Sequence, residues 1–163
     1  MQLPERYLTI SIAEQQLMLI EQGIVLRRFT VSTAKNGAGQ RKGSYCTPTG
    51  WHQIRAKIGA AVPQNGVFVA RRFTGEIYSP QLAEQHPYRD WILSRILWLD
   101  GLEAGHNRYG AVNTASRYIY IHGSPDMLMT GQPESHGCVR MLNADIIELF
   151  ADVAANTRVW IQP

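Results

Sequence analysis

Hydrophobic and polar residues alternate along the start of the chain in the way that is typical of half-buried β-strands. Residues 7–12 and residues 16–21 both alternate with a period of two. Gln22 and Gly23 follow as a turn, and a third apolar run extends over residues 24–33. We therefore expect a β-hairpin between the second and third strands.

Shorter apolar runs, separated by loop-forming residues, continue this pattern to the C-terminus. Residues 34–44 are rich in Gly, Lys, Asn and Arg and predict an exposed loop. Residues 75–89 predict a loop or short-helix insertion, which we interpret as a lid over a site. Residues 100–114 predict another loop. Five more strands are expected, at residues 51–58, 67–73, 91–99, 118–122 and 158–161.

One segment has the period of a helix. Asn143 is the expected N-cap, and the helix should run to about Ala155 with Ile146, Phe150 and Val153 on one apolar stripe. About eight strands and one substantial C-terminal helix predict a mainly β fold that resembles a sandwich or barrel. We expect residues 1–163 to form a single domain, because this length suits one hydrophobic core.

The composition is that of a folded protein with a small excess of positive charge. Apolar residues make up 45% of the chain and charged residues 18%, and the formal net charge is +3. No block of Lys or Arg indicates nucleic-acid binding, and no apolar stretch approaches the roughly 20 residues of a membrane span. The N-terminus shows no signal-peptide pattern. We expect a cytoplasmic protein, or a periplasmic one if a leader has been removed; the sequence indicates no oligomeric state.

His122 and Cys138 are the residues at which candidate chemistry concentrates. His122 ends an apolar and aromatic strand, and we expect the following Gly123 to leave one side of the imidazole open. Cys138 stands in a tight turn at residues 135–138, whose polar and small residues argue against a buried strand. A neutral imidazole within hydrogen-bonding distance can take the thiol proton and leave an ion pair, which makes a thiolate at neutral pH.

The neighbours of Cys138 supply candidates for supporting roles. Ser135 is expected to cap the turn or to contact substrate rather than to attack it. Arg140 is either a solvated charge or a group that binds a carboxylate through a bidentate fork, and its place two residues after Cys138 favours binding.

Two questions about the base stay open. His136 lies two residues before Cys138 and is the alternative to His122 as the base. No carboxylate is clearly placed to orient the His122 ring, so the carbonyl of Gly123 and the side chain of Asp126 are both candidates.

A zinc site is the metal-binding alternative. His122, His136 and Cys138 are all zinc-ligand types. Arg140 beside a dication is unfavourable, so we expect no metal and no cofactor. Cys46 has no nearby histidine in the sequence and is expected to be a small, semi-buried residue.

These residues together resemble the signature of the L,D-transpeptidase catalytic domain (YkuD-type) family. That signature is a His, a spacer in the mid-teens, and a Ser/Thr-His-Gly-Cys turn followed by a hydrophobe and Asn or Arg. Residues 135–140 match the turn, and Cys138 follows His122 by 16 positions. Residues 47–50 match the family's Thr-Pro-x-Gly segment, and the early hairpin matches its opening strands.

The resemblance implies a β-rich fold with Cys138 as nucleophile and His122 as base. It implies that the Gly123 carbonyl orients the imidazole and that backbone N–H groups near Gly137 and Cys138 hold the oxyanion. The implied substrate is a peptidoglycan tetrapeptide stem, cut between its third residue (an L-centre, usually of diaminopimelate) and the terminal D-Ala. A thioester forms on Cys138 and D-Ala leaves.

The acceptor of the acyl group is the point on which this sequence departs from the family. Members that cross-link the wall are exported or anchored, and this sequence shows neither a leader nor a wall-binding module. With water as acceptor, the same acyl-enzyme is an L,D-carboxypeptidase that acts on soluble stem peptides recycled from the wall, which is our leading expectation. L,D-transpeptidation, which forms cross-links or exchanges the terminal D-amino acid, is the alternative. A non-catalytic peptidoglycan-fragment binder or zinc domain is the third.

Overall fold

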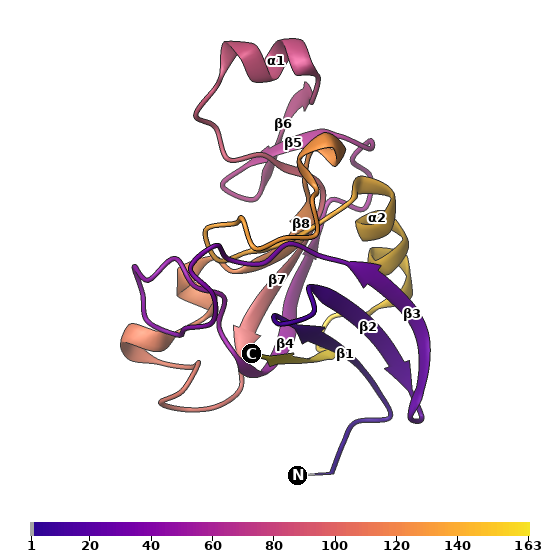
Figure 1. Cartoon of the computed structure of the whole chain (residues 1–163). Coiled ribbons are helices and arrows are strands. Elements are labelled where there is room, and N and C mark those ends of the chain that lie inside the picture. Colours follow the sequence, from indigo (N-terminus) through magenta and orange to yellow (C-terminus); the bar gives the residue numbers. More distant parts are fainter. Residues whose placement is uncertain (1) are drawn as a thin grey trace.

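The computed structural model describes residues 2–163, and its strands form one ten-stranded sheet. Figure 1 follows the elements along the chain. The strands are β1 Arg6–Ser11, β2 Gln16–Glu21, β3 Ile24–Thr30, β4 Gly50–Ile58, β5 Gly66–Val69, β6 Arg72–Ile77, β7 Ile92–Gly101, β8 Tyr120–Gly123, β9 Val139–Met141 and β10 Arg158–Gln162. The helices are α1 Pro80–Gln85 and α2 Asn143–Asp152, with short 3₁₀ turns at Gly110–Val112, Ala115–Arg117 and Asp126–Leu128. No helix in this part of the chain combines the length and hydropathy that crossing a membrane requires.

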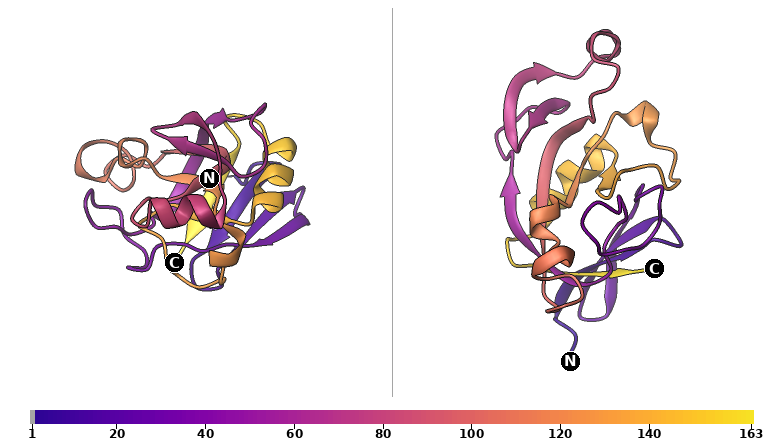
Figure 2. Two further views of the ribbon diagram at one scale, coloured as in Figure 1. Left: turned by 90° about the horizontal axis from the view of Figure 1, so that it is seen from above. Right: turned by 90° about the vertical axis from the view of Figure 1, so that its left-hand side faces the viewer.

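The sheet is mixed, and its strand order brings distant parts of the chain together. The order is β3-β2-β1-β10-β4-β7-β5-β6, with β8 paired to β7 and β9 paired to β8. The β1–β10 and β8–β9 pairs are parallel, and the other pairs are antiparallel. The last strand therefore lies between the first strand and β4, and it joins the N-terminal hairpins to the rest of the sheet (Figure 2).

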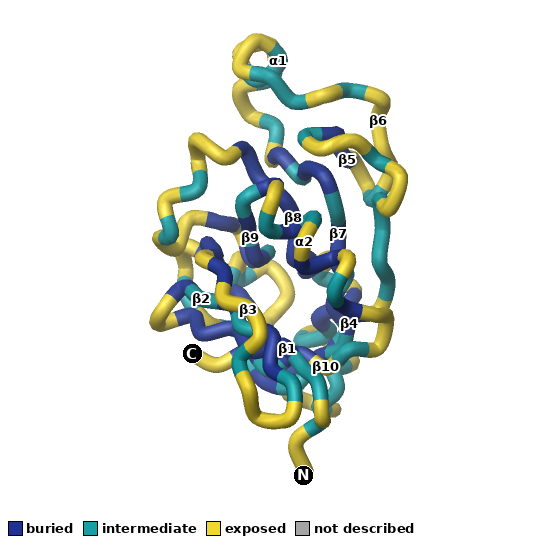
Figure 3. Tube along the Cα trace, turned by 90° about the vertical axis from the view of Figure 1, so that its right-hand side faces the viewer, coloured by how far each residue is buried: buried dark blue, intermediate teal, exposed yellow. Residues whose placement is uncertain are grey.

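Helix α2 covers the centre of the sheet and closes the main hydrophobic core. Ile146, Phe150 and Val153 form the predicted apolar stripe, and all three are buried in one cluster with side chains of β7 and β8 such as Leu97 and Ile121. Figure 3 shows these central strands as the buried part of the trace, with α1 and the N-terminus at the exposed ends. The predictions of a mainly β fold and of one substantial C-terminal helix are confirmed.

The prediction of a single strand over residues 67–73 is wrong. The chain turns back at Ala70 and Arg71, between β5 and β6. Both residues have positive φ, +48° and +64°, in a two-residue turn where Asn and Gly are the usual residues. Because the turn contains neither, the sequence gives no turn signal. The expected insertion at residues 75–89 contains the end of β6 and α1, and its role as a lid stays a prediction.

A bulge in β7 turns the Ser94 side chain away from its predicted face but keeps the other side chains in place. Strict alternation along the strand predicted at residues 91–99 places Ile92, Ser94, Ile96 and Trp98 on one face. Ser94 has φ +69°, and the register to β8 shifts between Leu93 and Ile96. Three steps along β7 match one step along β8, so two extra residues are inserted and the alternation beyond them is kept. Ile92, Ile96 and Trp98 therefore pack in one cluster with Tyr120, as predicted, whereas Ser94 Oγ donates to Asn143 instead.

The N-cap prediction for α2 is also wrong. Leu142 occupies the N-cap, and Asn143 is the first helical residue. The Asn143 side chain is buried and joins three segments: it accepts from Ser94 Oγ at 2.5 Å and donates to Ser124 O at 2.8 Å and Asp126 Oδ1 at 3.1 Å. Asp126 Oδ1 also accepts from the Asn143 backbone N–H at 3.0 Å, so it serves the cap of α2 instead of orienting the histidine.

Candidate active site

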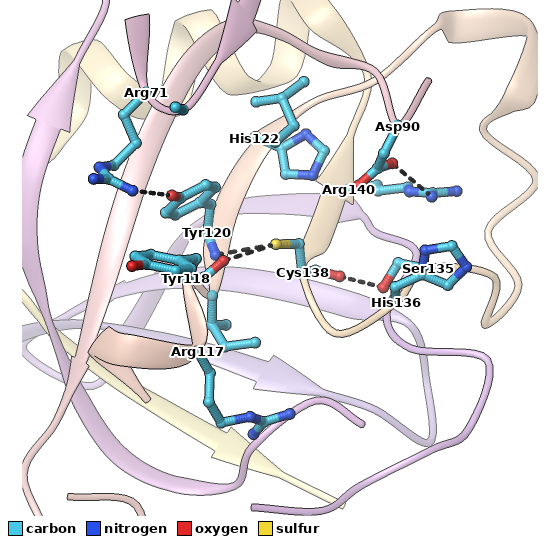
Figure 4. A pocket seen from close by; sticks show the side chains of 13 residues that line it. Arg71, Asp90, Arg117, Tyr118, Tyr120, His122, Ser135, His136, Cys138 and Arg140 are labelled. Carbon is cyan, nitrogen blue, oxygen red and sulfur yellow. Dashed lines mark hydrogen bonds and ion pairs between the residues drawn. The ribbon is translucent and has the colours of Figure 1, made fainter. Parts of the chain in front are cut away.

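Two parallel strands bring four side chains of the site to one face of the sheet. The register pairs His122 of β8 with Arg140 of β9, so Cys138, just before β9, lies level with Tyr120. Side chains two positions apart on a strand point to the same face. All four line one cavity of about 480 Å³ (Figure 4).

The His122 ring is buried and is fixed in one tautomer by its neighbour. Its Nδ1 lies 2.6 Å from the carbonyl oxygen of Gly123. A carbonyl only accepts hydrogen bonds, so Nδ1 carries the hydrogen and Nε2 of the neutral ring is a free base. Nε2 is buried and has no hydrogen-bond partner among residues 2–163. The contact that the resemblance implies between Gly123 and the imidazole is therefore present.

Gly123 has a different structural role from the one expected. A Cβ at this position would lie 2.5 Å from the backbone oxygen of Leu93 and 2.7 Å from Asn143 Oδ1. The glycine therefore lets β8 pack tightly against β7 and α2, and it does not open space beside the ring.

The Cys138 thiol is half-buried and is held by backbone groups of the strand beside it. Its Sγ donates to Tyr118 O at 3.4 Å and accepts from the Tyr120 N–H at 3.3 Å (Figure 4). Burial raises the pKa of the thiol to about 12, and the Tyr120 N–H only partly offsets this. Burial also lowers the pKa of His122, against smaller raising effects of Asp90 and the Gly123 carbonyl. Both shifts favour a neutral thiol beside a neutral imidazole over the ion pair expected from the sequence.

The turn before Cys138 requires a glycine and is capped by a serine. Gly137 has φ +132°, and a Cβ there would lie 3.0 Å from Ile119 Cδ1. Ser135 Oγ donates to the Cys138 carbonyl at 2.5 Å and accepts from the Gly137 N–H at 3.2 Å, so it caps this turn. The Cys138 N–H donates no hydrogen bond within residues 2–163, whereas the Gly137 N–H is occupied. Their oxyanion role stays a prediction.

Thr47 explains why the Thr-Pro-x-Gly segment lies beside the site. Its side chain is fully buried, and Oγ1 donates to the Gly137 carbonyl at 2.9 Å while it accepts from the Ala34 N–H at 2.9 Å. This threonine ties the nucleophile's turn to the loop after β3. Its neighbour Cys46 is half-buried as expected, and its carbonyl accepts from Arg117 at 2.7 Å.

Several charged groups line the same cavity, and the sequence singled out only Arg140 among them. Arg71, Arg117 and Arg140 all border it, and Asp90 is the one carboxylate on its wall among the residues described. Arg140 Nη2 lies 3.3 Å from Asp90 Oδ1, so part of the guanidinium is already paired. Arg71 lies in the unrecognised β5–β6 turn and Asp90 after the insertion. Only their three-dimensional positions, and no motif, bring them to Cys138.

His136 lies apart from the buried centre of the site. It is exposed and packs edge-to-face against Tyr45, with ring centroids 5.7 Å apart, although it also borders the cavity. The proposed zinc ligands are not brought together: among residues 2–163, no three His, Cys, Asp or Glu side chains group as a metal site.

Comparisons with known proteins place this geometry in a family. A family model described as the L,D-transpeptidase catalytic domain, YkuD, matches residues 5–161. The chain belongs to this family. No curated protein matches the chain at a significant level.

Solved structures of this family share the fold. An L,D-transpeptidase from Mycobacterium smegmatis superposes with a TM-score of 0.61 at 16% identity, over 98% of this chain and 59% of that one. L,D-transpeptidase 3 from Mycobacterium tuberculosis has a TM-score of 0.60 at 17% identity, over 98% and 62%. The L,D-transpeptidase from Xylanimonas cellulosilytica has a TM-score of 0.55 at 20% identity, over 99% of this chain and 62% of that one. The chain thus spans about three fifths of the length of these proteins.

Proposed function

We propose that this protein is a cysteine acyl-enzyme peptidase that removes the terminal D-Ala from peptidoglycan tetrapeptide stems, an L,D-carboxypeptidase. The family membership supports the peptidoglycan substrate. The free Nε2 of His122, on the same cavity as Cys138, supports the acyl-enzyme chemistry. A cytoplasmic location belongs to the same proposal, because soluble stem peptides recycled from the wall would be met there.

The neutral resting pair defines the order of proton movements. As Cys138 Sγ attacks the carbonyl carbon of the third residue, His122 Nε2 accepts the thiol proton. The C–N bond to D-Ala then breaks, and the leaving amine takes that proton, which leaves a thioester. Water attacks the thioester while His122 accepts its proton. The C–S bond breaks, and the sulfur regains a proton from His122.

The charge of the cavity is the observation that favours water as acceptor. Three arginines line the cavity, and its acid, Asp90, is already paired with Arg140. A protonated amine acceptor approaching Cys138 would be repelled by these cations, whereas water would not. Arg140 is also placed to bind the terminal carboxylate of a tetrapeptide, in exchange for its contact with Asp90.

One observation favours transpeptidation as the second candidate. A further cavity of about 370 Å³, bordered by Lys42 and Tyr45, shares Arg117, Tyr118 and His136 with the cavity of Cys138. It offers room for a second peptide whose amine would attack the thioester.

The product ratio distinguishes the two functions. A defined tetrapeptide is incubated with the protein, with and without an excess of an amino acceptor, and the products are resolved by mass. We expect the tripeptide and free D-Ala in both cases. Cys138→Ala should abolish D-Ala release, and Cys46→Ala should leave it nearly unchanged. Dominant exchanged or cross-linked product with negligible tripeptide would favour the transpeptidase instead.

A further inference from the structure

A second cavity, of about 290 Å³, adjoins the candidate active site on the side of β4 and β7. It shares Arg71 and Tyr118 with the cavity of Cys138. The carbonyl of Tyr118 accepts the hydrogen bond of the Cys138 thiol at 3.4 Å. The second cavity therefore begins at a residue that contacts Cys138.

Two guanidinium groups border this cavity without a carboxylate partner. The central carbons of Arg55 and Arg71 lie 4.7 Å and 4.5 Å from the ring centroid of Trp98. Within the described chain, neither arginine forms an ion pair with an acid. Two like charges over one ring repel each other, and the ring offsets only part of that repulsion. An anion in this cavity would neutralise both and would meet planar N–H donors suited to a carboxylate.

Arg71 is fixed in place by contacts on three aromatic side chains. Its Nη1 donates to the Tyr120 hydroxyl at 3.0 Å, and its guanidinium lies 5.0 Å from the Tyr118 ring as well as over Trp98 (Figure 4). The backbone beneath it is strained, because Ala70 and Arg71 both have positive φ without being glycine. A side chain held this firmly is prepared to bind a ligand at little further entropic cost.

We propose that the Arg55–Trp98–Arg71 cavity binds a second carboxylate of the substrate, the one on the side chain of the residue whose carbonyl carbon is attacked. This inference rests on the proposed function for the identity of the peptide. Arg140, on the opposite side of Cys138, is left for the terminal carboxylate. The cavity would then select stems whose third residue carries an acidic group, such as diaminopimelate, over stems with lysine at that position.

The test compares two tetrapeptides that differ by one carboxylate, with either diaminopimelate or lysine as the third residue. Binding is measured by calorimetry in the Cys138→Ala protein, so the result does not depend on turnover. We expect the diaminopimelate peptide to bind about 10-fold to 100-fold more tightly, the range of one charge-assisted contact. Arg71→Gln and Arg55→Gln should each reduce this preference and leave the affinity for the lysine peptide nearly unchanged.

Arg108→Gln is the matched control. Arg108 also lies over an aromatic ring, Tyr109 at 5.0 Å, but borders neither cavity, so the preference should persist. Equal affinity for the two peptides, equal losses for both in Arg71→Gln, or no binding of either would overturn the inference. D-Ala release by the protein with Cys138 intact decides the proposed function separately, since that reaction can occur with either peptide.

Discussion

At the scale of single residues, burial favours the neutral forms of both Cys138 and His122. Cys138 and His122, the pair that the sequence motif singles out, both line one cavity. The motif does not predict their protonation, because burial decides it: the pKa of the thiol is raised to about 12 and that of the imidazole is lowered. Burial depends on packing from β7 and α2, which no local pattern reveals.

The lowered pKa of His122 has a measurable consequence for the pH dependence of the reaction. The base must be neutral, and its pKa lies below the ordinary 6.5. Catalytic efficiency (kcat/KM) for D-Ala release should therefore stay level as the pH falls through 6.5 and decline only under more acidic conditions. A pH profile of the tetrapeptide reaction measures this. An acid limb at or above 6.5 would contradict the assignment.

Substitution of His122 and of His136 tests which of the two histidines is the base. His122→Ala should lower the rate by about 10²–10⁴-fold, the usual contribution of a general base. His136→Ala, at an exposed ring that packs on Tyr45, should change the rate far less. The reverse order of effects would make His136 the base.

At the scale of elements, the buried side-chain amide of Asn143 joins α2 to β7 and to the segment after β8. The sequence predicts α2 and its apolar stripe well, because the period of Ile146, Phe150 and Val153 is local information. It misplaces Asn143, since an asparagine before an apolar run is a frequent N-cap. Its actual partners, Ser94 and Ser124, are distant in sequence.

Removing this amide should destabilise the fold. Asn143→Ala leaves the Ser124 carbonyl without its buried partner and the Ser94 hydroxyl with only the Asn65 N–H, which costs about 1–3 kcal/mol at most and less if water enters. We expect the free energy of unfolding, measured with urea, to fall by about 2 kcal/mol. Asn36→Ala, which loses an exposed hydrogen bond to Ser44, should stay within about 0.5 kcal/mol. Equal effects of the two changes would contradict the role of Asn143.

At the scale of the whole molecule, β10 holds the two halves of the sheet together. Val159 and Ile161 are fully buried, and the strand pairs with β1 on one side and β4 on the other. The sequence predicts a closing strand at these positions. It does not reveal the partners, because a parallel pairing between the ends of the chain leaves no turn signal between them.

Loss of this strand should abolish the cooperative fold. Burial of each aliphatic side chain contributes about 1.5–3 kcal/mol, and deleting residues 158–163 also removes two hydrogen-bonded ladders. That loss is comparable with the whole stability of a typical domain, about 5–15 kcal/mol. Thermal unfolding followed by circular dichroism should show no cooperative transition in the truncated protein. As a control, deleting residues 2–4, which precede β1, should preserve the cooperative transition. A cooperative transition in the protein that lacks residues 158–163 would contradict the role of β10.

The parallel pairing of β1 with β10 also limits how much of the sheet can form while the chain is being synthesised. Residues 6–11 are made early, yet residues 158–162, which must lie beside them, are made only after β2 to β9 and α2. While the ribosome is still translating, the N-terminal hairpins can form, but they cannot dock onto β4. Until residues 158–162 emerge, the nascent chain carries an unpaired strand edge on β1, open to other chains. Translation of residues 158–162 therefore determines whether the edge of β1 is covered or stays open to other strands.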